Sequence, residues 1–478
     1  MFKKILVLLA GFTAAVSFSQ ETVNTIPLSL KGNRDVFQIV ETSKNEVTLF
    51  LSDKKKVNAM RLNEQLQIMD SLSSSHPGKV YSDMIGYINN GNQYKLFWSS
   101  GNSKEIASQT YDFEKRTVVI NTFSSKLKDE KVIQKFSDNG VFYMATVLKD
   151  SNILKLYIFD KADHLTEKTI NLEGYKFYLS NFKKSTLYGV LQEDLMPFEN
   201  AFSLQQITTE SPTSLTYSSK KRKCYIQNGT FIISFDTNPS YTQLINITLS
   251  NLSAVEKIYK TPFLQTTEFT PARSNSFLMD DKLFQIKLTS EKMILSIKDS
   301  QDNILKELPT LVTEEINYKN SPITQENGSS SNQRILEKTN QFLRKVSNSN
   351  CGISGYKING NYFLKIGSVS EVQDNNGAMY GAMFGMAGVL IASAISNPTF
   401  DNFNSYSSRK VVYINTLFDN NGNHISGDIN PVAFDKIQNH IEKNKNLVSP
   451  TLFKMNNTYY LGNYDTYTKQ YILRKFVD

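Results

Sequence analysis

The sequence predicts an all-β protein, a β-propeller of seven or eight four-stranded blades. Most of the chain consists of apolar runs of about five to eight residues that are separated by polar turns, as strands require. One such run recurs along the chain with an aromatic or aliphatic centre. Phenylalanine (30) and tyrosine (24) greatly outnumber tryptophan (1), which favours pleated sheets over helices.

The recurring run gives the repeat length of the predicted propeller. Its first six members lie about 44 to 57 residues apart, near the length of a four-stranded unit. A second series of strand-like stretches in phase with the first ends in polar turns near Asn63, Asp112, Asp160, Thr208, Ser250, Asp299 and Asp419. Each turn predicts a hairpin between the third and fourth strands of a unit. The run centres are Phe37, Ile85, Phe142, Leu187, Phe231, Phe284, Phe363 and Tyr460.

Eight centres suggest eight blades, and seven blades remain open if the first repeat is split. Residues 22–30 form an orphan strand, which we expect to pair into the last blade and close the ring. The repeats lack the Gly-His…Trp-Asp signature and the kelch glycine pair. Paired β-sandwiches are the alternative architecture.

Two stretches interrupt the β pattern within a single domain that spans residues 20–478. Residues 312–352 are predicted to insert a polar linker (312–332) and then a helix on the propeller rim (Gln333–Val346). A second, shorter helix is expected over Val432–Lys443, opened by Asn430 and Pro431. The apolar face of the first helix is predicted to consist of Ile335, Leu336, Thr339, Phe342, Leu343 and Val346.

The N-terminus predicts export. Residues 1–19 have the pattern of a signal peptide, with Lys3 and Lys4 before an apolar stretch and with Ser17 and Ser19 at the cleavage site. No cysteine follows the apolar stretch, which argues against lipoprotein anchoring. We therefore expect a periplasmic protein that is associated with the outer membrane, or alternatively an extracellular one.

Charge and cysteine content narrow the possible partners. The net charge of +8 over 478 residues is mild, so it is compatible with loose contact with anionic lipid and argues against nucleic acid. The densest basic run, Lys220–Lys223, is predicted to be a solvated loop. The two cysteines, Cys224 and Cys351, can either pair or remain free, since sequence does not give their separation.

The most unusual segment is a glycine-rich apolar insertion at residues 375–408. No charged residue occurs between Asp374 and Asp401, and small residues spaced four apart are typical of helices that pack closely in membranes. The insertion is expected either to project from the propeller as a hydrophobic finger or to pack as a helix across its face. A single membrane crossing is not expected, because strands of one blade precede and follow it. The candidate partner-binding residues are Gly377, Gly381, Met383, Phe384, Gly385, Met386, Gly388 and Leu390.

The sequence predicts no catalytic residue, metal site or cofactor. None of the four histidines has a second histidine or a cysteine at ligand spacing. The stretch Gly352–Gly355 falls short of a nucleophile elbow. Asp419–His424 begins like a calcium loop but has histidine where the loop needs glycine, so a turn is predicted there.

These observations favour a non-enzymatic interaction subunit that docks on, or plugs, an outer-membrane protein complex through the insertion. A secreted propeller-fold hydrolase or lyase and a surface glycan-binding or adhesion protein are the alternatives. The leader, the overall plan and residues 377–396 resemble periplasmic accessory proteins of Bacteroidota, including the plug subunit of the type 9 secretion translocon. The resemblance implies a translocon as partner. The C-terminal residues YILRKFVD lack the sorting pattern of type 9 cargo, which favours a periplasmic resident.

Overall fold

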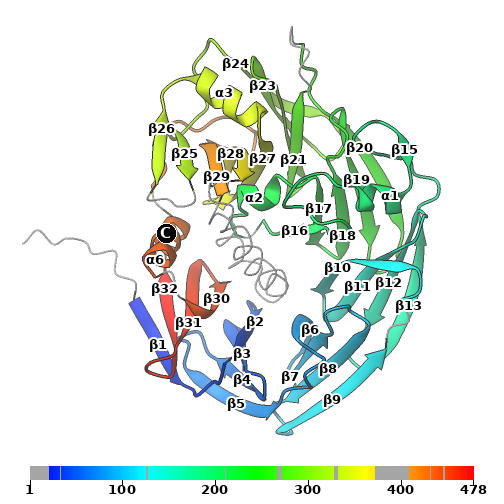
Figure 1. Ribbon diagram of the computed structural model, residues 1–478. Helices are drawn as coiled ribbons and strands as arrows, with labels where there is room; N and C mark the ends of the chain where they lie inside the picture. Colours follow the sequence, from blue (N-terminus) through cyan, green and yellow to red (C-terminus); the bar gives the residue numbers. More distant parts are fainter. Residues whose placement is uncertain are drawn as a thin grey trace, which may run out of the picture.

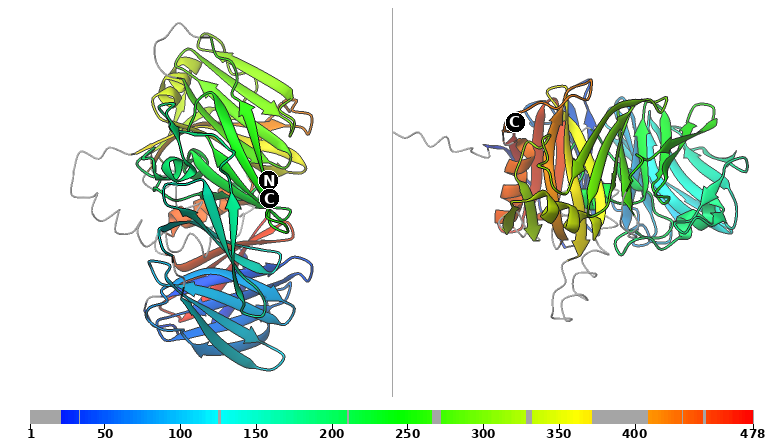
Figure 2. Two further views of the ribbon diagram at one scale, coloured as in Figure 1. Left: turned by 90° about the vertical axis from the view of Figure 1, so that its right-hand side faces the viewer. Right: turned by 90° about the horizontal axis from the view of Figure 1, so that it is seen from above.

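The computed structural model describes residues 21–32, 34–124, 127–209, 211–265, 272–327, 332–371, 409–430, 432–444 and 447–477. Within these ranges the protein is mostly β-structure, in sheets of four or five strands that follow one another around a ring (Figure 1). Seen from above in Figure 2, the ring is one layer of sheets deep. The all-β, propeller-like class is therefore confirmed, and the sheets do not pair off as two sandwiches.

The first three sheets are meanders in which each strand pairs with the next one in sequence. The first strand of each lies nearest the ring axis and the fourth lies outermost (Figure 1). Outer strands such as β9 and β13 are mostly exposed, whereas the middle strands are buried on both faces. The strands are β2 (Asp35–Glu41), β3 (Glu46–Ser52), β4 (Lys56–Leu62) and β5 (Ile68–Ser75); β6 (Asp83–Asn90), β7 (Gln93–Ser99), β8 (Glu105–Asp112) and β9 (Thr117–Ser124); β10 (Glu130–Asp138), β11 (Val141–Leu148), β12 (Ile153–Phe159) and β13 (Leu165–Asn171).

The fourth and fifth sheets keep this meander, and a short parallel strand is added to the inner edge of the fourth. The fourth comprises β16 (Gln205–Ile207), β17 (Arg222–Gln227), β18 (Thr230–Phe235), β19 (Tyr241–Thr248) and β20 (Ala254–Lys260). The fifth comprises β21 (Arg273–Met279), β22 (Lys282–Leu288), β23 (Lys292–Lys298) and β24 (Ile304–Leu311).

The sixth sheet corrects two predictions. Its order, from the outside inward, is β26 (Gln333–Leu336), β25 (Ile323–Asn327), β29 (Arg409–Phe418), β28 (Asn361–Glu371) and β27 (Asn350–Ile358). The supposed linker therefore contains β25, and the first turn of the supposed helix is β26. Both segments are strands because β25 pairs on one side with β29 and on the other with β26. The helix begins only at Thr339.

The ring closes as expected. The last sheet contains β30 (Val448–Met455), β31 (Thr458–Asp465) and β32 (Gln470–Phe476), and its outer strand is the N-terminal β1 (Glu21–Pro27). Strand β1 runs antiparallel to β32, from Glu21 opposite Lys475 to Pro27 opposite Gln470. The first described strand of the chain thus covers the edge that β32 would otherwise expose.

The prediction of a strand centred on Leu187 is wrong. Leu187 begins helix α1 (Leu187–Gln192), whose first turn is capped by the Thr186 hydroxyl, which accepts from the Gly189 amide. Only the two-residue strands β14 (Phe177–Tyr178) and β15 (Lys184–Ser185) accompany it. With this centre removed, the described ranges hold seven sheets of four or five strands.

The hydrophobic core lies between neighbouring sheets. The five largest clusters of buried apolar side chains each join two or three successive sheets, as where Phe97 of the second sheet stacks on Phe142 of the third with ring centroids 4.4 Å apart. A Cβ atom at Gly86 would lie 2.4 Å from the ring of Phe142, so glycine is required there. Because these contacts link the last sheet to the first and each sheet to the next as far as the sixth, the ring is stabilised across its sheets rather than sheet by sheet.

Most of the predicted polar turns are present. Asp160 and Asp299 accept backbone N–H groups two and four residues ahead, which closes the hairpins β12–β13 and β23–β24. The Asp419 turn has the same hydrogen bonds, as predicted, although no partner strand in its own sheet follows it. The prediction at Thr208 is wrong, because the parallel β16 ends there instead of a hairpin.

The remaining helices are short. They are α2 (Leu215–Ser218), α3 (Thr339–Ser347) and α6 (Ala433–Lys443). Helix α6 confirms the second predicted helix, and the Asp435 carboxylate accepts from the Val432 amide at its start. The predicted signal peptide lies outside the described residues.

Candidate functional site

The predicted docking residues lie outside the described residues, within positions 372–408: Gly377, Gly381, Met383, Phe384, Gly385, Met386, Gly388 and Leu390. What the structure describes is the base from which this insertion leaves and to which it returns. Its two ends are the ends of β28 and β29, where Glu371 is the register partner of Arg409. The ladder continues without a shift to Tyr362 opposite Phe418. Both ends therefore emerge together from paired strands inside a five-stranded sheet.

The inner face of this base packs against α2. Leu215 of α2 forms an apolar cluster with Val369, Val411 and Tyr413, and Phe198 packs against it. Close approach is possible because β27 carries glycine at position 352, where a Cβ atom would lie 3.0 Å from Ser219. The base of the insertion is thus held in place on this face.

A cavity of about 410 Å³ lies on the same face of the sixth sheet, between its strands and α6. The hydroxyl of Tyr413 donates to Oε1 of Glu326 at 2.6 Å, and Nζ of Lys365 lies 4.2 Å from the centroid of the Tyr413 ring. The walls combine aromatic rings with side-chain amides, a mixture that suits a polar ligand. They include Ser354, Tyr356, Phe363, Asn415, Phe434, Gln438 and Asn439.

The basic run Lys220–Lys223 is not a solvated loop. Arg222 and Lys223 are fully buried in β17, and each is paired with a carboxylate from elsewhere in the chain. Nε of Arg222 donates to Glu199 at 2.8 Å, and Nζ of Lys223 donates to Asp236 at 2.7 Å. The run contributes to the polar core of the fourth sheet.

The second of these pairs is the centre of a hydrogen-bonded network. Asp236 also accepts from the hydroxyls of Thr242 and Ser276, while Lys223 also donates to Asn275. Burial by itself would raise the pKa of Asp236, but Lys223 and Lys221 bring this pKa below its ordinary value. The carboxylate is therefore charged, and its surroundings satisfy it.

Two carboxylates and an amine near the ring axis were not predicted as site residues from the sequence. Asp35 and Asp83 are the first residues of the inner strands β2 and β6, and Lys135 lies on the next inner strand, β10. Burial raises the pKa of Asp35 to about 6, and the charge of Asp83 adds to this rise. Burial lowers the pKa of Lys135 to about 8. Such groups can exchange protons near neutral pH.

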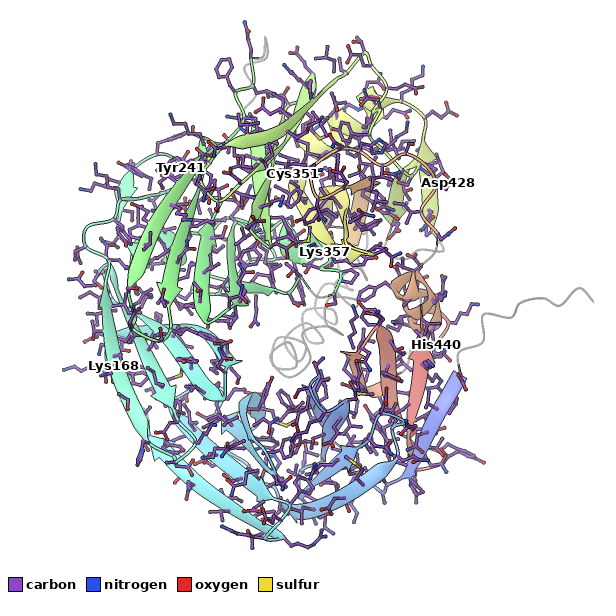
Figure 3. All side chains as sticks on the ribbon, turned by 180° about the vertical axis from the view of Figure 1, so that it is seen from behind. Lys168, Tyr241, Cys351, Lys357, Asp428 and His440 are labelled. Carbon is purple, nitrogen blue, oxygen red and sulfur yellow. The ribbon has the colours of Figure 1, made fainter. Side chains whose placement is uncertain are left out.

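The histidines are separate from one another. His440 of α6 lies at the edge of the ring (Figure 3), and burial together with Arg474 and Lys443 lowers its pKa to about 4. Burial likewise lowers the pKa of His424, whose ring contacts Asn320. Within the described ranges, no three His, Cys, Asp or Glu side chains are placed to hold a metal ion.

The cysteines are not paired. Cys224 and Cys351 are both free thiols buried in the core, and Figure 3 shows Cys351 among the strands of the sixth sheet. Burial raises the pKa of Cys224 to about 12. Of the described helices, none has the length and apolar character to cross a bilayer.

Comparisons with known proteins show only distant structural likeness. No family model matches the chain, and no curated protein matches it. A subtype N10 neuraminidase-like protein of A/little yellow-shouldered bat/Guatemala/060/2010 is 10% identical over 73% of this chain and 95% of its own, with a TM-score of 0.27. The SapL1 lectin in complex with alpha methyl fucoside is 6% identical over 72% and 90%, with a TM-score of 0.24.

Synechocystis apocarotenoid oxygenase is 9% identical to this chain, with a TM-score of 0.30. The match covers 60% of this chain and 63% of the oxygenase, so it spans less than two thirds of that protein. At these identities and TM-scores, none of the three likenesses bears on what the chain does.

Proposed function

We propose that the chain is a seven-bladed propeller that acts as an exported, non-enzymatic interaction subunit in the periplasm. It docks on, or plugs, an outer-membrane protein complex such as a secretion translocon, and the insertion at 377–396 makes the contact. The resemblance to the plug subunit of the type 9 translocon favours this class of partner. The predicted signal peptide supports the compartment.

The observation that carries the proposal is the base of the insertion. Glu371 and Arg409 are register partners, so the chain leaves one blade and returns to it at the same point. A segment attached in this way is presented on one side of a stable scaffold, as a docking element requires. A single membrane crossing, by contrast, would need its two ends on opposite sides.

The composition of the insertion supplies the binding energy. Met383, Phe384, Met386 and Leu390 are large apolar side chains, and burying each of them is worth about 1.5–3 kcal/mol. If the segment is helical, each of its glycines costs up to about 1 kcal/mol relative to alanine. The gain exceeds this cost only when the apolar side chains are covered, and an outer-membrane partner would cover them.

Partner recovery from native membranes tests the proposal. The chain is tagged at its C-terminus, extracted in mild detergent and compared with a variant in which a short Gly/Ser loop replaces 377–396. We expect a β-barrel membrane protein to co-purify with the wild type and to be lost from the variant. The matched control is Phe263→Ser with Tyr467→Ser, which removes two apolar side chains that are 84% and 94% exposed elsewhere. Retention of the same partners by the loop variant contradicts the proposal.

A second candidate function is a hydrolase or lyase whose site lies near the ring axis. It is supported by Asp35 and Asp83 on neighbouring inner strands and by the raised pKa of Asp35. Screening the wild type against glycoside and ester substrates, beside Asp35→Asn, tests it. Turnover that the substitution abolishes would favour this candidate over docking.

A further inference from the structure

A second cavity, of about 230 Å³, lies on the opposite face of the sixth sheet from α2. Helix α3 packs on this face, and its last turn ends over β28 and β29 (Figure 1). Because Ser370 pairs with Lys410 and Ser368 with Val412, these four side chains share one side of the sheet. The walls of the cavity are Arg344, Lys345, Asn348, Ser349, Ser368, Ser370, Lys410 and Val412.

The charges of this cavity are all of one sign. Arg344, Lys345 and Lys410 line it, and Arg334 of β26 lies close enough to act on Lys345. Throughout the part of the chain that the structure describes, none of these four cations forms an ion pair with a carboxylate. Burial and the three neighbouring cations lower the pKa of Lys345. A bound anion would offset both effects and favour the charged form of Lys345.

The helix dipole of α3 explains the positions of only two of these four cations. Arg344 and Lys345 stand in the last turn of α3, where cations favour the helix dipole. That effect does not account for Lys410 and Arg334, which come from strands. The cations with the least exposed side chains, Lys95, Arg222, Lys223 and Lys298, each have a carboxylate partner. The partly exposed or exposed cations at the cavity differ from these, because they lie together without one.

We propose that this cavity binds a phosphoryl group. Arginine offers a planar fork of N–H donors and each lysine offers an ammonium, while Ser349 and Ser370 add hydroxyls. Donors that converge from a helix and two strands match a tetrahedral oxyanion, whose oxygens point in several directions, better than a flat carboxylate. The group comes either from free phosphate or from a phospholipid headgroup. The proposal stands on these wall residues and not on the insertion.

Two probes distinguish the sources. Inorganic phosphate is titrated into the full chain by calorimetry at low salt, and flotation measures binding to phosphatidylcholine vesicles with and without phosphatidylglycerol. The pocket variant is Lys345→Gln with Lys410→Gln. The control, Lys54→Gln with Lys168→Gln, removes the same charge from exposed lysines, of which Lys168 lies on outer strand β13 (Figure 3). Near-UV circular dichroism and the urea midpoint verify that both variants are folded.

We expect the pocket variant to bind about 100-fold more weakly, because two charge-assisted hydrogen bonds are lost. The control is expected to change affinity by less than about twofold, since exposed charges are screened. If the pocket variant loses phosphate binding, the ligand is the free anion. If it loses only vesicle binding, the ligand is the phospholipid headgroup. Both results support the proposal. It is overturned if neither probe binds the wild type, or if the control weakens binding equally.

The insertion variant separates this proposal from the docking function. Replacing 377–396 with the Gly/Ser loop leaves all of the pocket walls in place. We expect its phosphate affinity to equal that of the wild type, even if its membrane partner is lost. A loss of phosphate binding in this variant would also overturn the proposal.

Discussion

The buried ion pair between Arg222 and Glu199 gives the sharpest test of the structure. Both side chains are almost fully buried, at 0% and 1% exposure. One guanidinium nitrogen of Arg222 also donates to the carbonyls of Leu191 at 2.6 Å and Glu193 at 3.0 Å. Arg222→Met would fill similar volume while removing the guanidinium that donates to these carbonyls and to the carboxylate.

The size of the effect follows from these contacts. Removing one partner of a buried pair costs about 3–5 kcal/mol, because the remaining charge stays buried. Two backbone amides, those of Lys221 and Arg222, still donate to Glu199 and moderate the loss. We therefore expect the free energy of unfolding to fall by about 3–4 kcal/mol. Arg222→Met with Glu199→Leu should recover much of it, since an apolar pair of similar volume is tolerated.

Urea denaturation is the assay. The single tryptophan, Trp98, is 1% exposed and lies in the second sheet. Comparing its fluorescence with far-UV circular dichroism therefore shows whether distant sheets unfold together. The control is Arg116→Met, which breaks a 2.6 Å pair with Asp70 in which the arginine is 59% exposed. It should cost no more than about 1 kcal/mol. If Arg222→Met costs as little as this control, the buried pair does not stabilise the fold as described.

Four further predictions follow from the fold. Gly352→Val should lower the free energy of unfolding by about 1–3 kcal/mol through the clash with Ser219, whereas Gly174→Ala, with open space around it, should be nearly neutral in urea denaturation. Both cysteines should resist a thiol reagent in the native protein and react in denaturant; rapid native labelling would contradict their burial. Hydrogen bonds from Asn303 lower the pKa of Asp299 below its ordinary 3.8. The stability that these bonds give the folded protein is therefore present above pH 3.8 and is lost as the pH falls through the pKa of Asp299 in the folded state. Urea midpoints against pH should therefore decline less steeply in acid for Asp299→Ala. Deleting residues 21–27 should make the chain self-associate as concentration rises, which gel filtration would detect; a monomeric, equally stable product would contradict the role of β1.

Local patterns predicted the repeating part of the fold well. Short apolar runs identified most inner and middle strands, and aspartate side chains that accept from backbone amides two residues ahead marked turns such as Asp160 and Asp299. Both signals depend on neighbours in sequence, so they are visible without coordinates. The closing strand was predicted for a different reason, because an unpaired strand at one end matched an open edge at the other.

The failures came from partners distant in sequence. Leu187 belongs to an apolar run like the others, yet its amide donates to the Asn152 side chain and the next amide donates to the Ser151 carbonyl, at the start of helix α1. Lys220–Lys223 has the composition of a surface loop, and only Glu199 and Asp236 bring two of its members into the core. Both outcomes depend on tertiary contacts that composition does not record.

The candidate sites were predicted unevenly. The insertion was predicted from its composition. The cavity beside α3 was not predicted, because its walls come from α3, β28 and β29, which only the fold brings together. Asp35 and Asp83 did leave a signal, since each stands two residues before a recurring centre, Phe37 and Ile85. A comparison of equivalent positions among the repeats would have found both carboxylates.

The pairing of β1 with β32 also determines when folding can finish. Thr25 lies opposite Ile472, so this contact must wait until nearly the whole chain has been made. Closing so long a loop costs about 2 kcal/mol more entropy than closing one a tenth as long. The earlier sheets can form while the chain is still being made, but the first strand has to stay unpaired until the last residues are available. Pairing of β1 with β32 is therefore expected to be a late step of folding, and a chaperone that holds the N-terminal strand would act in that interval.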